Sequence, residues 1–278
     1  MNAYAASRLH SVPVARRELR VEGLSKQFTS RHGSTMTAVD DVSFRVLPGE
    51  VCALLGPSGC GKSTVLRMVA GLEQPSDGSI VLSGREVTGP GRDRGLVFQS
   101  YTCFPWLTVR ENVAYGLKVT GSTLALREGT VDYFLERVKL TPFADRYPDE
   151  LSGGMRQRVA IARTLANGPD LLLMDEPFGA LDSETRWQMQ RLLLDVVRRE
   201  GMSVLMVTHD VDEALYLADK VVCLSRHPGR VRDILMPPAE KPDEPEALYS
   251  APAFVRLRSD ILRMLREEGA TAPLGETP

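Results

Sequence analysis

A glycine-rich segment near residue 60 has the residue types and spacing that hold a phosphate chain. It reads Gly56-x4-Gly61-Lys62-Ser63 and lies between the apolar run 51–55, a predicted strand, and a predicted helix. Glycines let backbone N–H groups turn toward phosphate oxygens, and a helix N-terminus adds favourable potential. Lys62 would reach the β- and γ-phosphates, and the Ser63 hydroxyl would bind Mg²⁺. The pattern predicts a P-loop rather than a glycine-rich turn without a ligand.

Two acidic residues, Asp175 and Glu176, follow the apolar run 171–174, which predicts a buried strand. At the end of a strand beside a P-loop, Asp175 could order the metal ion while Glu176 polarises the attacking water. The pair by itself is equally typical of an ordinary surface turn. The preceding P-loop is what favours the catalytic interpretation.

Two further polar residues end predicted strands. His209 follows the strand 204–207, and ligands gather at the carboxyl ends of strands in open α/β sheets. An isolated histidine is more often structural, but this position favours a role at the phosphates. Gln99 ends the strand-like run 95–98 and is uninformative alone.

A second glycine-containing helix start occurs nearly a hundred positions after the first. It reads Leu151-Ser-Gly-Gly-Met-Arg-Gln157 and has no lysine at a phosphate-binding position. Ser152 is a good N-cap, so without the P-loop this stretch would be an ordinary capped helix. With it, the segment is a second candidate for contact with phosphate.

The elements that must position these residues are predicted by hydrophobic patterning. Apolar runs with the length of buried strands alternate with helical patterns, which indicates an α/β sheet. We expect Gly71 to end the helix after the P-loop and Asp210 to cap the helix after His209. Residues 79–87 are expected to form one half-exposed strand.

The chain is expected to fall into three parts. Residues 1–18 form a flexible lead-in, 19–230 the main domain with a helical part at about 100–168, and 231–278 a C-terminal extension. The extension contains one helix, predicted over 254–268. Whether this helix packs on its own domain, meets a second copy or does neither is left open.

Composition limits the possible classes of protein. The chain has 278 residues, a net charge of −2 and 43% hydrophobic residues, ordinary values for a globular protein. The near-neutral charge argues against a general nucleic-acid binder. The four cysteines lie far apart, which disfavours disulfide frameworks and zinc sites. No apolar run is long enough for a signal sequence or a membrane span, so a cytoplasmic protein is expected.

Taken together, these segments resemble the ATP-binding cassette (ABC) ATPases. The P-loop, Gln99, the 151–157 segment, Asp175-Glu176, Ala180-Leu-Asp182 and His209 occur in that family's order and at its usual separations. The resemblance covers roughly residues 19–226. It implies an α/β P-loop NTPase (RecA-like) core, an antiparallel β subdomain and a helical insertion that carries the LSGGQ-like signature at 151–157.

The resemblance also implies roles for individual residues. Phe28 would stack on adenine, Glu176 would polarise the attacking water, His209 would contact the γ-phosphate, and Gln99 would meet the metal and the water. Mg²⁺ would be held by Ser63, Gln99 and Asp175. The residues expected to contact ATP are Phe28, Gly56, Pro57, Ser58, Gly59, Cys60, Gly61, Lys62, Ser63, Thr64, Ser152, Gly153, Gly154, Gln157 and Asp182.

The family's assembly would explain why two glycine-rich helix starts accompany a single lysine. In the family, the signature of one subunit closes over the γ-phosphate held by the P-loop of the other. One chain would then supply half of two composite sites, and a head-to-tail homodimer with two ATP molecules would complete them. Asp182 would lie in the loop that communicates across the dimer.

Three functional classes of ABC ATPase remain possible at this point, because the fold does not determine which process ATP hydrolysis drives. They are DNA-maintenance ATPases, ribosome-associated factors and the energy subunits of membrane transporters. A DNA-maintenance ATPase would need a long coiled coil before the signature, and sustained heptads are absent there. Ribosome-associated factors of the family usually carry two cassettes. A membrane transporter is favoured by the aromatic loop 101–109, which contains Phe104 and Trp106. Such a cluster forms either a small core or a docking patch for the membrane subunit.

Within the transporters, the segments 104–109, 178–182 and 225–230 look most like importer ATPases of the nitrate/sulfonate/taurine type. The expected function is to power uptake of a small solute such as nitrate, taurine or an aliphatic sulfonate. The protein would lie on the cytoplasmic face of the cell membrane, bound to permease subunits near Phe104 and Trp106. A solute-binding protein outside the cell would act with it indirectly, and no nucleic acid is expected.

Overall fold

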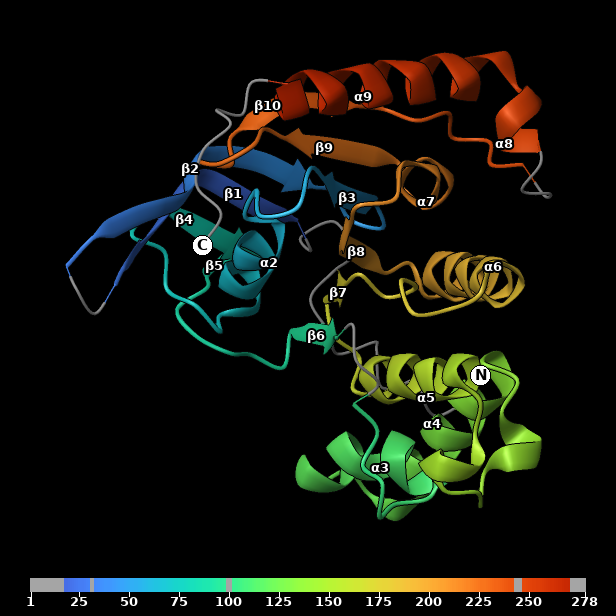
Figure 1. Cartoon of the computed structure of the whole chain (residues 1–278). Coiled ribbons are helices and arrows are strands. Elements are labelled where there is room, and N and C mark those ends of the chain that lie inside the picture. Colours follow the sequence, from blue (N-terminus) through green and yellow to red (C-terminus); the bar gives the residue numbers. More distant parts are fainter. Residues whose placement is uncertain (1–17, 31–32, 99–101, 243–246, 271–278) are drawn as a thin grey trace. The chain divides into compact units, whose positions relative to one another are not determined.

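The computed structural model describes residues 18–30, 33–98, 102–242 and 247–270 (Figure 1). The chain divides into two compact units. One unit takes in residues 47–49 and 90–204, and the other takes in 18–46, 50–89 and the chain from 205 onward. The first is called the helical unit below and the second the P-loop unit.

The P-loop unit contains an antiparallel sheet in the order β2-β1-β4-β5. Its strands are β1 (Leu19–Thr29), β2 (Thr35–Val46), β4 (Asp77–Leu82) and β5 (Arg85–Glu86). Val21 lies between Phe44 and Ile80 of the two neighbouring strands, and all three side chains are buried. Alternation of buried and exposed residues along β1 and β2 gives the sheet one apolar face, as expected of an antiparallel sheet covered on one side. The predicted antiparallel β subdomain is confirmed.

The expectation of a single strand over 79–87 was wrong. The segment is a hairpin, in which β4 pairs antiparallel with β5 and the turn consists of Ser83 and Gly84. Both turn residues have positive φ, 53° and 76°, as a two-residue turn between twisted strands requires. The Ser-Gly pair was the available sequence signal.

The P-loop unit also contains strands in the order β10-β9-β3-β8. They are β3 (Val51–Leu55), β8 (Ser203–Thr208, whose first two residues belong to the helical unit), β9 (Lys220–Leu224) and β10 (Val231–Leu235). β3 pairs parallel with β9, and all five of its residues are buried, which explains its unbroken apolar sequence. β10 pairs antiparallel with β9.

The end of one helix of this unit and the start of another lie where the sequence indicated. Helix α2 (Lys62–Ala70) follows the P-loop and ends at Gly71, whose left-handed φ of 75° lets its N–H close the last turn. Helix α7 (Val211–Leu217) is capped by Asp210, whose carboxylate accepts hydrogen bonds from the N–H groups of Asp212 and Glu213.

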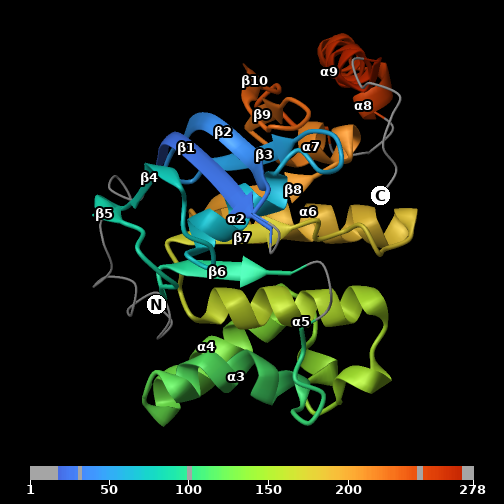
Figure 2. The same ribbon diagram turned by 60° about the vertical axis from the view of Figure 1, so that its left-hand side comes forward.

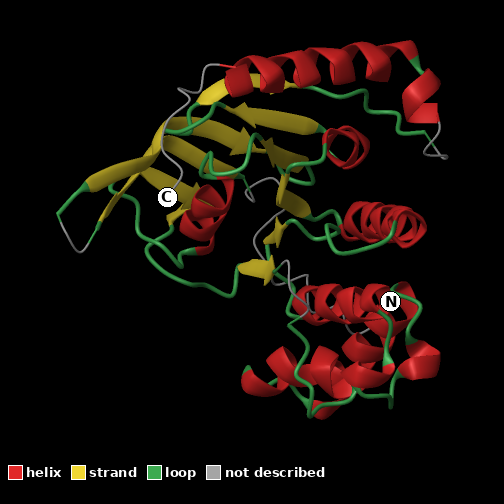
Figure 3. Ribbon diagram, viewed as in Figure 1, coloured by secondary structure: helices red, strands yellow, loops and turns green. Residues whose placement is uncertain are grey.

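The helical unit carries the insertion. The strands β6 (Arg94–Val97) and β7 (Leu171–Asp175) pair in parallel, and the described residues between them form only helices and loops (Figure 3). These elements are α3 (Val109–Val119), α4 (Leu124–Arg137), η2 (Thr141–Phe143), η3 (Pro148–Glu150) and α5 (Gly153–Ala166), with α6 (Ser183–Glu200) after β7. Figure 2 shows α3 and α4 packed together on one side of α5.

The C-terminal part of the P-loop unit adds α8 (Ala247–Ser250) and α9 (Pro252–Ala270) to β10. Helix α9 packs on its own domain, since Phe254 and Ile261 are buried and α9 contacts α7. Of the alternatives that the sequence left open, packing on its own unit is therefore the one that the structure shows. None of the described helices is long and apolar enough to cross a membrane.

Candidate functional site

The P-loop joins β3 to α2 through a backbone that requires glycine at two points. Gly61 has a φ of 90°, and a Cβ there would lie 2.6 Å from Val39 Cγ2. A Cβ on Gly56 would lie 2.8 Å from Cys60 Sγ and 2.9 Å from the Leu224 carbonyl oxygen. Any side chain at either position would displace the loop from the strands beneath it. The glycine spacing is thus a packing requirement as well as a phosphate-binding signal.

Lys62 holds its ammonium group inside the curve of the loop. The residue is only 6% exposed, and Nζ donates to the carbonyl oxygens of Gly56 at 2.7 Å and Pro57 at 2.9 Å. These carbonyls compensate part of the cost of burying the charge. The ammonium charge therefore lies beside the first turn of α2, whose N–H groups carry partial positive charge. Together the two favour binding of a polyphosphate.

Cys60 has a fully buried side chain under this loop. Burial raises the pKa of its thiol above the ordinary value, and the nearby Lys62 ammonium offsets part of that effect. The group is therefore a neutral thiol at physiological pH, a small apolar filler rather than a reactive thiolate.

Asp175 and Glu176 lie at the end of β7 in the helical unit. Asp175 is the last residue of the strand, and Glu176 has a positive φ of 44°. A non-glycine residue in this region costs of order 1–3 kcal/mol, and such strain clusters at functional sites. The Glu176 carbonyl accepts the Gly179 N–H at 3.3 Å, which helps to hold the turn. The turn therefore fixes the main chain from which the Glu176 side chain starts.

The signature segment begins α5 in the same unit. Exposed Ser152 caps the helix by accepting the Met155 N–H at 3.3 Å, and the first turn has no acidic residue. A Cβ on Gly154 would lie 2.6 Å from Thr185 Cγ2 of α6, so glycine is needed for close packing there. Gln157 is fully buried, and both ends of its amide lack a partner in the described part of the chain.

Asp182 is exposed and caps α6 with a 2.9 Å bond from the Thr185 N–H. Hydrogen bonds from Thr185 hold the pKa of the Asp182 carboxyl below its ordinary value. The signature and the Asp182 turn therefore meet at Thr185. Its side chain packs against Gly154, and its N–H donates to the Asp182 carboxylate.

The remaining predicted residues fall in different places. His209 is exposed immediately after β8. Phe28 is 38% exposed near the end of β1, with Lys26 Nζ 5.1 Å from its ring centre. Gln99 lies outside the described residues. The P-loop unit thus holds Phe28, the P-loop and His209, while the helical unit holds Asp175, Glu176, the signature and Asp182.

The aromatic loop is an exposed cluster rather than a core of the insertion. Trp106 is 69% exposed and Tyr115 is 42% exposed, and both rings contact Phe104, with centroids 5.6 and 4.5 Å apart. The Arg163 guanidinium lies 5.1 Å from the Phe104 ring centre and also binds Thr102. A cavity of about 530 Å³ opens here, lined among others by Phe98, Phe104, Tyr115 and Val119.

Asn112 positions this loop, and sequence reasoning missed it. Its side chain is fully buried, and the amide bonds to the main chain of Phe104, Leu107 and Thr108. Thr108 and Glu111 form a capping box at the start of α3. The Thr-x-x-Glu spacing was a visible signal for that cap, whereas nothing in the sequence marks Asn112 as a loop anchor.

Comparison with known proteins decides the family. The model of the ABC transporter family matches residues 39–179. This chain belongs to that family. The chain is 45% identical over 253 residues to the nitrate import ATP-binding protein NrtD of Synechocystis, covering 89% of this chain and 95% of that one. It is 42% identical over 250 residues to the taurine import ATP-binding protein TauB of Jannaschia, covering 89% and 93%.

Solved structures agree with the family. A dimeric ATP-binding cassette, MJ0796 with ADP and Pi, matches with a TM-score of 0.69 and 30% identity, covering 80% of this chain and all of that one. CbiO1 from Clostridium perfringens matches with a TM-score of 0.72 and 26% identity, covering 91% and 97%. The predicted cassette fold and ATPase activity are confirmed, and the transporter interpretation stands over DNA maintenance or ribosome association.

Proposed function

We propose that this ABC ATPase powers the import of a small solute of the nitrate, taurine or aliphatic sulfonate class. The observation that carries the proposal is similarity along almost the whole chain to subunits named for nitrate and taurine import. A relative named for bicarbonate transport is 43% identical over 251 residues, which cover 89% of this chain and 38% of that one, so bicarbonate is a further candidate solute. Selection of the solute would rest with other subunits.

The P-loop fits Mg²⁺-ATP. Gly56 and Gly61 leave no room for a Cβ, and the buried Lys62 ammonium supplies the charge that β- and γ-phosphates need. Ser63, Asp175 and Gln99 would hold Mg²⁺. Each would bind through an oxygen atom, the ligand type that this cation prefers. The bound metal would neutralise charge that develops on the phosphates.

Glu176 would accept a proton from the attacking water, from a position fixed by the turn at the end of β7. His209, exposed after β8, would contact the γ-phosphate, and Phe28 would stack on the adenine. The phosphoryl group would pass to water in line with the leaving ADP oxygen.

Two copies would complete two sites in a head-to-tail homodimer. The first N–H groups of α5, at Gly153 and Gly154, would close over the γ-phosphate bound by the partner's P-loop, because a helix N-terminus without acidic residues favours anions. Gln157 and Asp182 would support this contact from the same unit. Dimeric solved cassettes support the arrangement.

The aromatic cluster would receive a short helix of the permease. Large exposed aromatic side chains around a cavity are typical anchors of protein interfaces. Closure of the dimer on ATP would move the helical unit and thereby the permease. The subunit would thus lie on the cytoplasmic face of the membrane, while a solute-binding protein delivers solute on the other side.

The decisive experiment is recovery of the membrane partner. Tagged protein is purified from detergent-solubilised native membranes as wild type, as Trp106→Ala and as Phe143→Ala. Phe143 is an exposed aromatic residue of the same unit outside the cluster and serves as the matched control. We expect wild type and Phe143→Ala to recover a polytopic permease and Trp106→Ala to lose it. Recovery of ribosomes or DNA complexes instead would overturn the importer function.

A further inference from the structure

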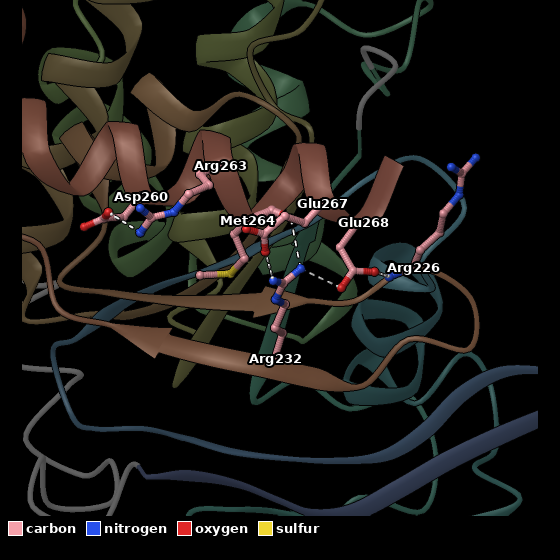
Figure 4. Close-up of polar contacts among 7 residues, drawn as sticks. All are labelled: Arg226, Arg232, Asp260, Arg263, Met264, Glu267 and Glu268. Atoms are coloured by element: carbon pink, nitrogen blue, oxygen red, sulfur yellow. Dashed lines mark hydrogen bonds and ion pairs between the residues drawn. The ribbon is translucent and has the colours of Figure 1, made fainter. Parts of the chain in front are cut away.

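The end of helix α9 is fastened to β10 and to the turn before it by charged side chains (Figure 4). Arg232 of β10 bonds to the Met264 carbonyl at 2.9 Å, to Glu268 at 2.8 Å and to Glu267. The second carboxylate oxygen of Glu268 accepts the main-chain N–H of Arg226 at 2.8 Å. One carboxylate therefore joins α9 both to a strand and to the backbone of a turn.

That turn, residues 225–230, lies against the P-loop. Ser225 and Arg230 close it by main-chain bonding, and Gly229 donates to the Ala38 carbonyl at 3.0 Å and accepts the Asp40 N–H at 2.9 Å. A Cβ on Gly229 would lie 2.0 Å from the Cys60 carbonyl oxygen. The turn thus packs directly on the backbone of the P-loop, and only glycine permits the approach.

A continuous set of contacts therefore runs from the C-terminal helix to the P-loop within one unit. Glu268 holds Arg226, the 225–230 turn carries Gly229, and Gly229 packs on Cys60, two residues before Lys62. The side chains of Arg232 and Glu268 are 29% and 18% exposed, so their attraction is screened less than that of a surface pair.

We propose that Glu268 is a positioning residue of the nucleotide site, which sets the P-loop through the 225–230 turn. Loss of its carboxylate frees the Arg226 N–H, loosens the turn and lowers the fraction of P-loops arranged to bind phosphate. Affinity for nucleotide then falls in proportion to that fraction. The inference rests on the assignment of the P-loop as the nucleotide site.

The test measures the Kd for a fluorescent ATP analogue with Mg²⁺, together with thermal stability, in the full-length chain. Glu268→Ala is compared with Asp260→Ala, which removes the same charge from α9 and, among the described residues, breaks a pair with Arg263 within that helix. Gly229→Ala is compared with Gly89→Ala, where a Cβ meets nothing within 4 Å. Glu268→Ala with Gly229→Ala completes a double-mutant cycle.

We expect Glu268→Ala to raise Kd roughly three- to tenfold, which corresponds to the loss of about 1 kcal/mol. Gly229→Ala should raise Kd at least as much, because its Cβ would collide with the Cys60 carbonyl oxygen. Both control variants should bind as wild type does. In the double variant the two effects should not multiply, because both act through the same turn. A helix that only stabilises the fold would lower the melting temperature and leave Kd unchanged.

Three results would overturn the proposal: an unchanged Kd for Glu268→Ala, equal effects of Glu268→Ala and Asp260→Ala on Kd, or a fully multiplicative double variant. Lys62→Ala separates this inference from the site assignment. If Lys62→Ala loses binding while Glu268→Ala keeps it, the link through the turn is wrong and the site stands. If Lys62→Ala binds normally, the assignment of the site itself is wrong.

Discussion

The side chain of Asn112 holds the main chain of Phe104 by two hydrogen bonds, accepting its N–H at 2.8 Å and donating to its carbonyl at 3.1 Å. A buried amide therefore fixes the loop that displays the exposed ring of Trp106. We predict that Asn112→Leu costs about 1–3 kcal/mol of unfolding free energy, because buried main-chain groups of the loop lose their partners. Chemical denaturation and permease recovery measure the two effects.

Trp106→Ala is the matched comparison for this loop. It removes an exposed ring without touching Asn112, so it should abolish permease recovery and leave stability near that of wild type. Asn112→Leu should impair both. Undiminished recovery with Asn112→Leu would show that the loop does not need this anchor.

Two substitutions at Glu176 separate its proposed role as base from the backbone strain of its positive φ. Glu176→Gln should bind ATP, lose hydrolysis by about 10²- to 10⁴-fold and accumulate ATP-bound dimers, because the amide cannot accept the proton. Steady-state hydrolysis and size-exclusion chromatography with ATP measure these effects. Normal hydrolysis by this variant would remove Glu176 from the role of base.

Glu176→Gly is predicted to lose hydrolysis while relieving a positive φ, so its stability should equal or exceed that of wild type by up to about 1 kcal/mol. Lys139→Gly is the control, since Lys139 has a φ of 57° and is exposed. Both glycine variants should shift the melting temperature in the same direction. Only Glu176→Gly should lose activity, and loss with Lys139→Gly would contradict this account.

Cys60 should resist thiol reagents at neutral pH. Burial raises the pKa of its thiol, so the reactive thiolate forms only at more alkaline pH than for an ordinary cysteine. Timed alkylation with iodoacetamide at pH 7 and pH 9, followed by mass spectrometry, should find Cys103 modified first, because it is partly exposed. Rapid modification of Cys60 in the folded protein at pH 7 would contradict the prediction.

The stability that the Asp182 cap gives to the start of α6 should be lost in acid. The pKa of the Asp182 carboxyl is lowered in the fold, so its contribution is present above the ordinary carboxyl value of about 3.9 and is lost as pH falls through the folded value. Asp182→Asn keeps a cap but cannot titrate, so its melting temperature should fall less than that of wild type below pH 4. Asp195→Asn removes the same charge from the middle of α6, together with a 2.7 Å pair with Arg199, and is the charge control. A profile changed as much as that of Asp182→Asn would contradict the role of the cap.

Sequence alone determined the parts of this protein that depend on local chemistry. The P-loop, the apolar β3 and β7, the glycine stop of α2 and the cap at Asp210 were all predicted, because each follows from a few adjacent residues and their backbone preferences. The Ser83-Gly84 hairpin was missed although its signal was equally local. Order and spacing of these segments were enough to indicate the family.

Tertiary structure decided what depends on contacts between distant residues. The 225–230 turn and Cys60 are far apart in sequence, yet their backbones pack so closely that Gly229 cannot carry a side chain. Asn112 binds a loop that precedes its own helix. Helix α9 packs on its own unit through the hydrogen bond of Glu268 to Arg226 and the buried side chain of Phe254. These contacts depend on burial and on the geometry of several segments at once, so the hydrophobic periodicity of any one segment does not predict them.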